Sequence, residues 1–572
     1  MAGRICRIIL GLGCTAIYAT VFAGLALAQG RGGASWNTAG NDAQRTSWVA
    51  ADPNISPETM TKPGFKLLWK VKVNNDARQG DSLSQAMTVA SYIGYRVFRS
   101  YAFFGGTSNN AIALDSDLGR VEWTRHFDVP NPPAGTAACP GGMTAGVSRP
   151  AALGAGAAGG GGGGGGRGAA GGSGRGGGGR GGAVSAVGQP GEGAVQVAAQ
   201  AANGGGRGGG GGGRGAAGGS GRGGGGRGAA AGSGRGRGGG RGGGTGNDLF
   251  ALASDGMLHL MYISNGEDAQ SAVRFLPANA NATGLTFTEN DAFVSTRNNC
   301  GGVPNAVWSV NLTGSDHTVN TWKTNGGSVV GTAFGADGTV YASTADGDYG
   351  PASFSDSVVA LEGQGLKMKD FFTPAKSDFT TTPIVFSFGG KTLVAVANKN
   401  GRIYLLDSTS LGGADHKTPL AQSTAFGTVI TGDLSTFDSG GTRWILAPVS
   451  GGLNAATNFA TRNGNASSGA VAAFKVVNQG GQFSLQPAWV SRDVVNPATP
   501  AIVNGVVLAV AGGDAQHAAI LYALDGSTGK DVWNSGTTMT SYTRSGISGG
   551  SSQFYVGTVD STIYAFGFEL VK

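Results

Sequence analysis

The chain has 572 residues, 110 of them Gly, and a formal net charge of +7. Charged residues make up only 13%, where about 25% is usual in soluble proteins. The glycine content does not indicate collagen, because Gly does not recur at every third position together with Pro. The length allows either several domains or one large all-β domain.

The N-terminus resembles a secretory signal peptide over residues 1–28. Arg4 and Arg7 precede an apolar run, and Ala26-Leu27-Ala28 supplies a small-residue cleavage site before Gln29. An uncleaved membrane anchor is the alternative. No later stretch is long and apolar enough to cross a membrane, so we predict a periplasmic or secreted protein without a transmembrane domain.

A short lead-in, residues 29–65, precedes a strand-like run at Leu67–Val73 that carries Trp69. Two later segments, AIALDSDLGRVEW (111–123) and LYALDGSTGKDVW (521–533), then share a pattern of Asp, Gly and Trp. The shared positions are Asp115, Gly119 and Trp123 in the first copy and Asp525, Gly529 and Trp533 in the second. The pattern predicts a strand, a tight turn begun by Asp with Gly at positive φ, and a strand whose Trp docks on a neighbouring repeat.

Residues 154–246 hold 51 Gly and ten Arg against one acidic residue, Glu192. The net charge of this segment alone exceeds the net charge of the whole chain, so the rest of the mature protein is mildly acidic. Because Gly loses the most backbone entropy on ordering and few apolar side chains are present, we expect a disordered insert. It lacks the aromatic residues on which bases stack, so we predict no specific nucleic-acid binding. Weak contact with polyanions is the alternative to a plain linker.

Outside the signal and the insert, short β-branched runs alternate with polar turns. Eight such strand cores begin near Tyr95, Leu249, Phe293, Val340, Leu393, Trp444, Val507 and Phe554. The last core lacks a Trp-bearing partner, whereas Leu67–Val73 is a Trp-bearing strand without a core before it. The two ends would therefore complete one blade and close a ring.

We predict an all-β fold, an eight-bladed β-propeller of four-stranded blades with tryptophan-docking motifs, interrupted by a disordered Gly/Arg-rich insert. It divides into signal peptide (1–28), lead-in (29–65), ring-closing strand and first blade (66–153), insert (154–246) and remaining blades (247–572). The insert should fall between the first and second blades. We expect a monomer that binds a protein partner or a small ligand on one propeller face.

The repeat A-L-D-x-x-x-G-x-x-x-W is similar to the repeat of pyrroloquinoline quinone (PQQ) enzymes, and the opening WNTAGNDAQRT (36–46) resembles the N-terminus of quinoprotein dehydrogenases. The resemblance implies an axial funnel in which a Trp floor and Asp, Glu and Asn hold PQQ and Ca²⁺. Non-enzymatic relatives use the same propeller as a binding scaffold, such as the lipoprotein of the outer-membrane β-barrel assembly complex.

Several departures favour the non-catalytic interpretation. The family's adjacent Cys pair and a C-x-x-C-H haem motif are both absent from the sequence. No position can be assigned as the catalytic Asp or the calcium Glu, so the catalytic and cofactor-binding residues are unknown. A PQQ- and Ca²⁺-dependent alcohol or sugar dehydrogenase is the alternative function.

Three further features remain open. Cys139 and Cys300, the cysteines left after signal removal, form either a disulfide or two separate thiols. Asp346 and Asp348 in an Asp-rich stretch are either weak Ca²⁺ candidates or turn formers. The polar stretch 453–469 is the first choice for a ligand-facing loop.

Overall fold

The computed structural model of the chain describes residues 35–78, 81–93, 98–129, 135–154, 248–348, 353–427 and 429–569. The signal segment 1–28 and all but the first residue of the insert 154–246 lie outside these residues. The regular structure of the described part is almost entirely β, with one short α-helix, α1 (Pro57–Met60), in the lead-in and two 3-10 turns at Cys300–Gly302 and Gly413–Asp415.

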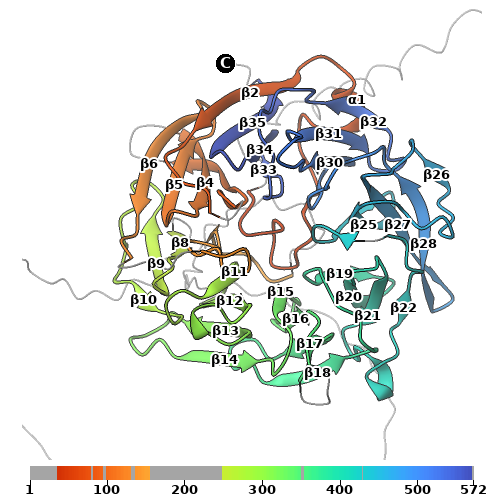
Figure 1. The fold of residues 1–572 in the computed structure, drawn as a ribbon, viewed down its shortest axis with the longest axis horizontal. Helices are drawn as coiled ribbons and strands as arrows, with labels where there is room; N and C mark the ends of the chain where they lie inside the picture. The colour runs from red at the N-terminus through yellow and green to blue at the C-terminus, as the bar shows by residue number, and fades with distance from the viewer. Residues whose placement is uncertain are drawn as a thin grey trace, which may run out of the picture. The chain divides into compact units, whose positions relative to one another are not determined.

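The strands form eight sheets, which follow one another around a ring (Figure 1). The closing blade contains β33 (Ser548–Gly550), β34 (Gln553–Gly557), β35 (Thr562–Phe568) and β2 (Phe65–Lys72). Blade 1 contains β3 (Met87–Ile93), β4 (Phe98–Gly106), β5 (Asn110–Asp115) and β6 (Arg120–His126). Blade 2 contains β7 (Val147–Ser148), β8 (Asp248–Leu252), β9 (Met257–Tyr262) and β10 (Val273–Arg274).

The next three blades repeat the same four-stranded antiparallel order. Blade 3 contains β11 (Asn281–Thr288), β12 (Asp291–Arg297), β13 (Ala306–Asn311) and β14 (Val319–Lys323). Blade 4 contains β15 (Val329–Phe334), β16 (Val340–Thr344), β17 (Val358–Leu361) and β18 (Met368–Phe372). Blade 5 contains β19 (Ile384–Phe388), β20 (Lys391–Ala397), β21 (Ile403–Asp407) and β22 (Ala421–Gln422).

The last two blades carry extra strands. Blade 6 contains β23 (Val429–Ile430), β24 (Ser435–Ser439), β25 (Thr442–Ser450), β26 (Thr461–Arg462), β27 (Gly469–Gln479) and β28 (Gln482–Val490). Blade 7 contains β29 (Ala501–Val503), β30 (Val506–Ala511), β31 (Ile520–Asp525) and β32 (Asp531–Asn534), extended by β1 (Trp48–Val49), which pairs in parallel with β29.

The middle strands of the blades are apolar on both faces because each blade is packed between two others. In β30 the whole run Val506–Ala511 is buried, as expected for a strand without a solvent face. The buried apolar side chains form eight clusters, and each fills the space between two neighbouring blades. The core of the described part is therefore a ring of interfaces.

The ring closes by pairing the two ends of the propeller, as the sequence predicts. Strand β2 runs antiparallel to β35, with Phe65 opposite Phe568 and Lys72 opposite Thr562. The eight predicted strand cores also correspond to the second strands of the eight blades, although Tyr95 itself lies outside the described residues.

The predicted position of the insert is wrong by one strand. The described chain stops at Gly154, after β7, and resumes at Asp248 in β8, and these two strands belong to the same sheet. The insert thus falls inside blade 2. The sequence did not reveal this because β7 has only two residues, too few to give a strand pattern.

Candidate functional site

The centre of the ring is crossed by residues 36–49, whose backbone bonds to the inner strands of successive blades (Figure 1). The carbonyl oxygens of this segment accept N–H groups of Thr88, Arg149, Phe334, Val385, Thr436, Ile502 and Asn504. Because these donors come from six different blades, the segment ties the inner ends of the blades together. We call residues 36–49 the axial segment.

Arg45 places a buried charge in the axial segment. Its side chain donates from Nε to the Thr332 carbonyl at 2.9 Å, and from Nη2 to the Gly284 carbonyl at 3.0 Å and the Thr286 hydroxyl at 2.7 Å. Burial lowers the pKa of Arg45 to about 10, while Asp433 and Asp42 act in the opposite direction. Arg45 is therefore still a cation at neutral pH, held by blades 3 and 4.

A cavity of about 420 Å³ adjoins this segment at Thr38 and Ala39. Its walls come from the closing blade and blades 1, 2 and 3, which contribute residues such as Gly557, Met87, Val147 and Thr283. A volume of this size lies within the range of small-molecule sites. Among the described residues, no aromatic side chain lines the cavity.

Three charged side chains line the cavity: Asp81, Arg297 and Arg544. Burial raises the pKa of the Asp81 carboxyl, and the two guanidinium groups of Arg544 and Arg297 counteract it. Both cations therefore lie within electrostatic reach of the same carboxylate. Burial likewise lowers the pKa of Arg297, which Asp433 and Asp81 oppose.

One wall of the cavity is a loop fixed by a disulfide. Cys139 and Cys300 are bonded, with their Cα atoms 5.6 Å apart, so the structure shows the first of the two alternatives that the sequence left open. The carbonyl of Ala138, on the cavity wall, accepts from Asn281 Nδ2 at 3.0 Å and Asn298 Nδ2 at 2.7 Å. The bond thus attaches the connection between blades 1 and 2 to blade 3.

These residues do not fit PQQ and Ca²⁺. Calcium takes about six to eight oxygen ligands, and the described ranges contain no group of three His, Cys, Asp or Glu that could hold a metal ion. Asp81 is the one carboxylate among the residues that line the cavity, and two guanidinium groups beside it disfavour a divalent cation. The Trp floor that the resemblance implies is also missing from this lining.

The structure places the weak calcium candidates away from this cavity. Asp346 Oδ1 pairs with Lys376 Nζ at 3.2 Å, and the backbone carbonyl of Asp348 accepts from the Ser355 hydroxyl at 2.9 Å. Neither residue lines the cavity. Their contacts are those of turn residues.

The described lining of the cavity includes no residue of the stretch 453–469, and the proposed role of this stretch as a ligand-facing loop stays a prediction. Its Phe459 is buried against Phe426 and Phe474, and Asn463 Nδ2 donates to the Thr528 carbonyl of blade 7 at 2.8 Å. The polar composition of the stretch gave no indication that Phe459 is buried and packs the loop against blades 5 and 6.

The Trp-docking motifs lie at the interfaces between blades. Trp69 of the closing blade donates from Nε1 to the Ser116 carbonyl of blade 1 at 2.8 Å, and its ring covers Gly119, which has a φ of +63°. Asp115 Oδ1 accepts the N–H groups of residues 117 and 118 and so begins this turn. The second copy is alike: Asp525 Oδ1 accepts from Ser527 and Thr528.

The Trp that docks on the second copy was missed by sequence reasoning. Trp489 of blade 6 donates to the Gly526 carbonyl at 3.0 Å and covers Gly529. Trp533 instead packs edge-on against Phe65 of the closing blade, with ring centroids 4.8 Å apart. The sequence feature that could have pointed to Trp489 is its place at the end of LQPAWV, a strand-like run in which apolar and polar residues alternate.

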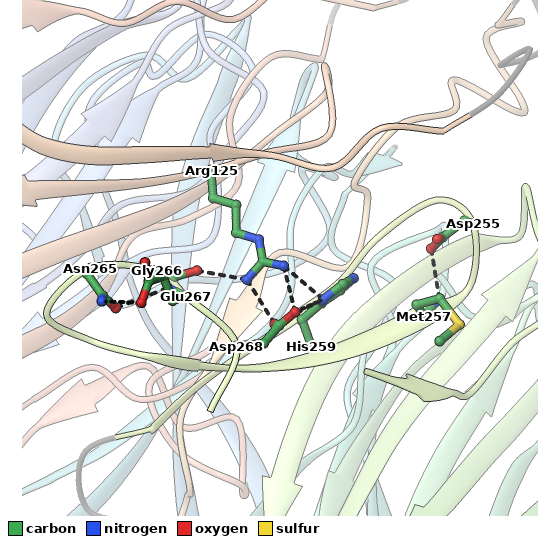
Figure 2. A network of polar contacts seen from close by, with 8 residues as sticks. All are labelled: Arg125, Asp255, Met257, His259, Asn265, Gly266, Glu267 and Asp268. Atoms are coloured by element: carbon green, nitrogen blue, oxygen red, sulfur yellow. Dashed lines mark hydrogen bonds and ion pairs between the residues drawn. The ribbon is translucent and has the colours of Figure 1, made fainter. Parts of the chain in front are cut away.

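The docking of Trp123 on blade 2 is reinforced by an ion pair. Trp123 Nε1 donates to the Ile263 carbonyl at 2.9 Å. Two positions further along β6, Arg125 forms a two-point contact with Asp268 at 2.8 and 2.7 Å, and His259 Nδ1 lies 3.1 Å from the same carboxylate (Figure 2). This cluster is a blade interface, and none of its residues lines the cavity.

Within the described ranges, we find no helix with the length and hydropathy needed to cross a membrane. The predicted signal peptide, residues 1–28, lies outside these ranges.

Comparison with known proteins identifies the fold. The quinohemoprotein alcohol dehydrogenase of Comamonas testosteroni matches 94% of this chain and 81% of its own, at 11% identity and a TM-score of 0.53. A quinohemoprotein alcohol dehydrogenase of Pseudomonas putida HK5 covers the same shares at 12% identity and a TM-score of 0.50. A europium-containing methanol dehydrogenase matches 94% of this chain and 99% of its own, at 10% identity and a TM-score of 0.51.

No family model and no curated protein matches the sequence. The structural likeness shows that this chain has the β-propeller fold of these dehydrogenases, and an activity does not follow from a shared fold.

Proposed function

We propose that this chain is an exported β-propeller that acts as a non-catalytic binding or scaffolding module of the cell envelope. One observation carries the proposal: the axis is occupied by residues 36–49, and the cavity beside them has two arginines and one aspartate on its wall. A quinoprotein site requires the opposite balance, with carboxylates around a metal ion. The axis is not filled by apolar side chains, however, so room for a ligand remains.

The test is reconstitution of the mature protein, beginning at Gln29, with PQQ and Ca²⁺. Dye reduction is measured with a panel of primary alcohols and aldose sugars. We expect no turnover above that of free PQQ in the same buffer. Saturable, protein-dependent turnover would overturn the proposal and establish the dehydrogenase.

Export is tested separately, because it rests on residues 1–28 alone. We expect the protein from the periplasm or medium to begin at Gln29 when its N-terminus is sequenced, and to elute as a monomer. An intact N-terminus beginning at Met1 would contradict a cleaved signal peptide.

A further inference from the structure

One of the arginines that line the cavity beside the axial segment has a buried hydrogen-bond donor that no described residue satisfies. Arg297 lies at the end of β12, and its Nε is buried without a partner. Arg544 is exposed and lines the cavity, and its guanidinium carbon lies 5.9 Å from the centre of the Tyr542 ring. Guanidinium groups carry five N–H donors in a planar fork that matches a carboxylate. An unpartnered buried donor costs stability unless a ligand or water satisfies it.

The charge balance of the wall favours an anion with a single charge. Among the described residues that line the cavity, Asp81 is the one carboxylate that opposes Arg297 and Arg544. Asp433, which does not line the cavity, also acts on Arg297 but is shared with the buried Arg45. Asp81 forms no ion pair within 4 Å with either arginine in the described part of the chain, although both act on its carboxyl. A monoanion therefore neutralises the wall, whereas a dianion such as phosphate would leave an excess negative charge in a partly desolvated site.

Part of the remaining wall is apolar and can hold an aliphatic body, although Ser, Thr, Gln and Asn side chains also line the cavity. Leu83, Met87, Met143, Val147 and Val559 contribute this apolar part together with several alanines, and no aromatic ring of the described residues lines it for stacking. Thioether and aliphatic groups accommodate alkyl chains of varied shape. The arginines come from blade 3 and from the segment that leads into the closing blade, so the anionic end of a ligand would lie between those blades.

We propose that the cavity binds a small aliphatic organic acid as its carboxylate, held by Arg297 and Arg544 with its alkyl part against Met87 and Met143. The inference rests on the proposed function, because a non-catalytic propeller leaves this cavity free for a ligand other than a quinone. It names the chemical class of that ligand.

Calorimetric titration with hexanoate tests the proposal on the mature protein. We expect saturable binding, and binding at least about tenfold weaker in Arg297→Gln and in Arg544→Gln, since each removes a charge-assisted contact. Asp81→Asn should bind hexanoate several-fold more tightly. The matched control is Arg120→Gln, which removes an exposed arginine on the outer strand β6 and should bind like the wild type.

Two further probes identify the chemistry. Hexanol, which has the same alkyl chain without the charge, and inorganic phosphate should each bind at least about tenfold more weakly than hexanoate. Thermal unfolding of each variant shows whether it is folded. If Arg297→Gln does not fold, Arg544→Gln still tests the proposal, because Arg544 is exposed and its replacement should not disturb the fold.

The proposal fails if hexanoate gives no saturable heat, or if both arginine variants bind it as tightly as the wild type. That result leaves the non-catalytic function standing. If PQQ displaces hexanoate and supports dye reduction, the cavity is a cofactor site, and both this inference and the proposed function fail.

Discussion

At the scale of single residues, the buried and half-buried arginines divide into two kinds. Arg45 is satisfied by carbonyl and hydroxyl oxygens of several blades, and Arg125 by Asp268 and the Gly266 carbonyl. Arg297 has no such acceptor in the described chain, which is why it carries a ligand proposal and the others do not. An arginine whose N–H groups are already bonded to acceptors of the same chain has a structural role, because those bonds offset the cost of removing its charge from water.

His259 provides a prediction on pH. Burial lowers its pKa, while Asp268 raises it and Arg125 lowers it further. The unfolded chain, with an ordinary histidine pKa of about 6.5, then binds a proton more readily than the folded protein. The contribution of His259 to stability is therefore fully present above about pH 6.5 and is lost as the pH falls through the lowered pKa.

We expect the free energy of unfolding to fall more between pH 7.5 and 5.5 in the wild type than in His259→Asn. Asparagine keeps a donor near the position of Nδ1 but does not titrate. Urea unfolding at both pH values measures the difference, and comparison of the two proteins cancels the other titrating groups. Equal pH dependence in the two proteins would contradict the prediction.

At the scale of elements, three pairs of neighbouring blades are joined by a tryptophan of an outer strand as well as by apolar packing. Trp69, Trp123 and Trp489 each place an indole N–H on a carbonyl in a turn of the following blade. The ring of each covers a glycine with positive φ: Gly119, Gly266 and Gly529. Only a residue without a Cβ allows the ring to approach this closely, so these glycines are set by the neighbouring blade as much as by their own turn.

Gly529→Ala tests this interface. The added Cβ would lie 2.3 Å from Cε3 of Trp489, at a φ of +71°. We expect a loss of about 2–4 kcal/mol in the free energy of unfolding, from backbone strain and displacement of the indole. Urea unfolding with tryptophan fluorescence measures both effects.

The matched control is Gly440→Ala. Gly440 also has a positive φ, +58°, but an added Cβ there meets nothing within 4 Å. It should lose only about 1 kcal/mol, the cost of the backbone conformation alone. If the two variants lose the same stability, the Trp contact contributes nothing beyond the turn.

At the scale of the whole molecule, the sequence predicted what is local or repeated and missed what is assembled from distant parts. The eight blades could be predicted because each repeats a strand, a turn and a strand within a short window. The cavity could not, since Asp81, Arg297 and Arg544 come from segments far apart in the chain and carry no shared motif. The place of the axial segment at the centre of the ring could not be predicted either, because its polar residues resemble an ordinary loop until six blades supply its hydrogen bonds.

The disulfide gives the whole ring a second covalent connection around the insert. Cys139 and Cys300 lie on either side of residues 155–247, so a break anywhere in that segment leaves both parts joined. The N-terminal part also supplies β2 to the sheet of β35 and β1 to the sheet of β29. A chain cut in the insert should therefore remain one folded propeller.

Limited trypsin digestion tests this continuity, because the ten arginines of the insert are cleavage sites. We expect the cut mature protein to elute at the volume of the intact protein and to run as one band on a denaturing gel without reductant. Adding reductant should separate it into two fragments on the denaturing gel.

In the Cys139→Ser variant, the two fragments should separate on the denaturing gel even without reductant. They should still elute together under native conditions, because the strand pairings hold them. Two bands from the cut wild type without reductant would show that the ring depends on strand pairing alone, and separate elution of the cut Cys139→Ser protein would show that pairing is too weak to hold it.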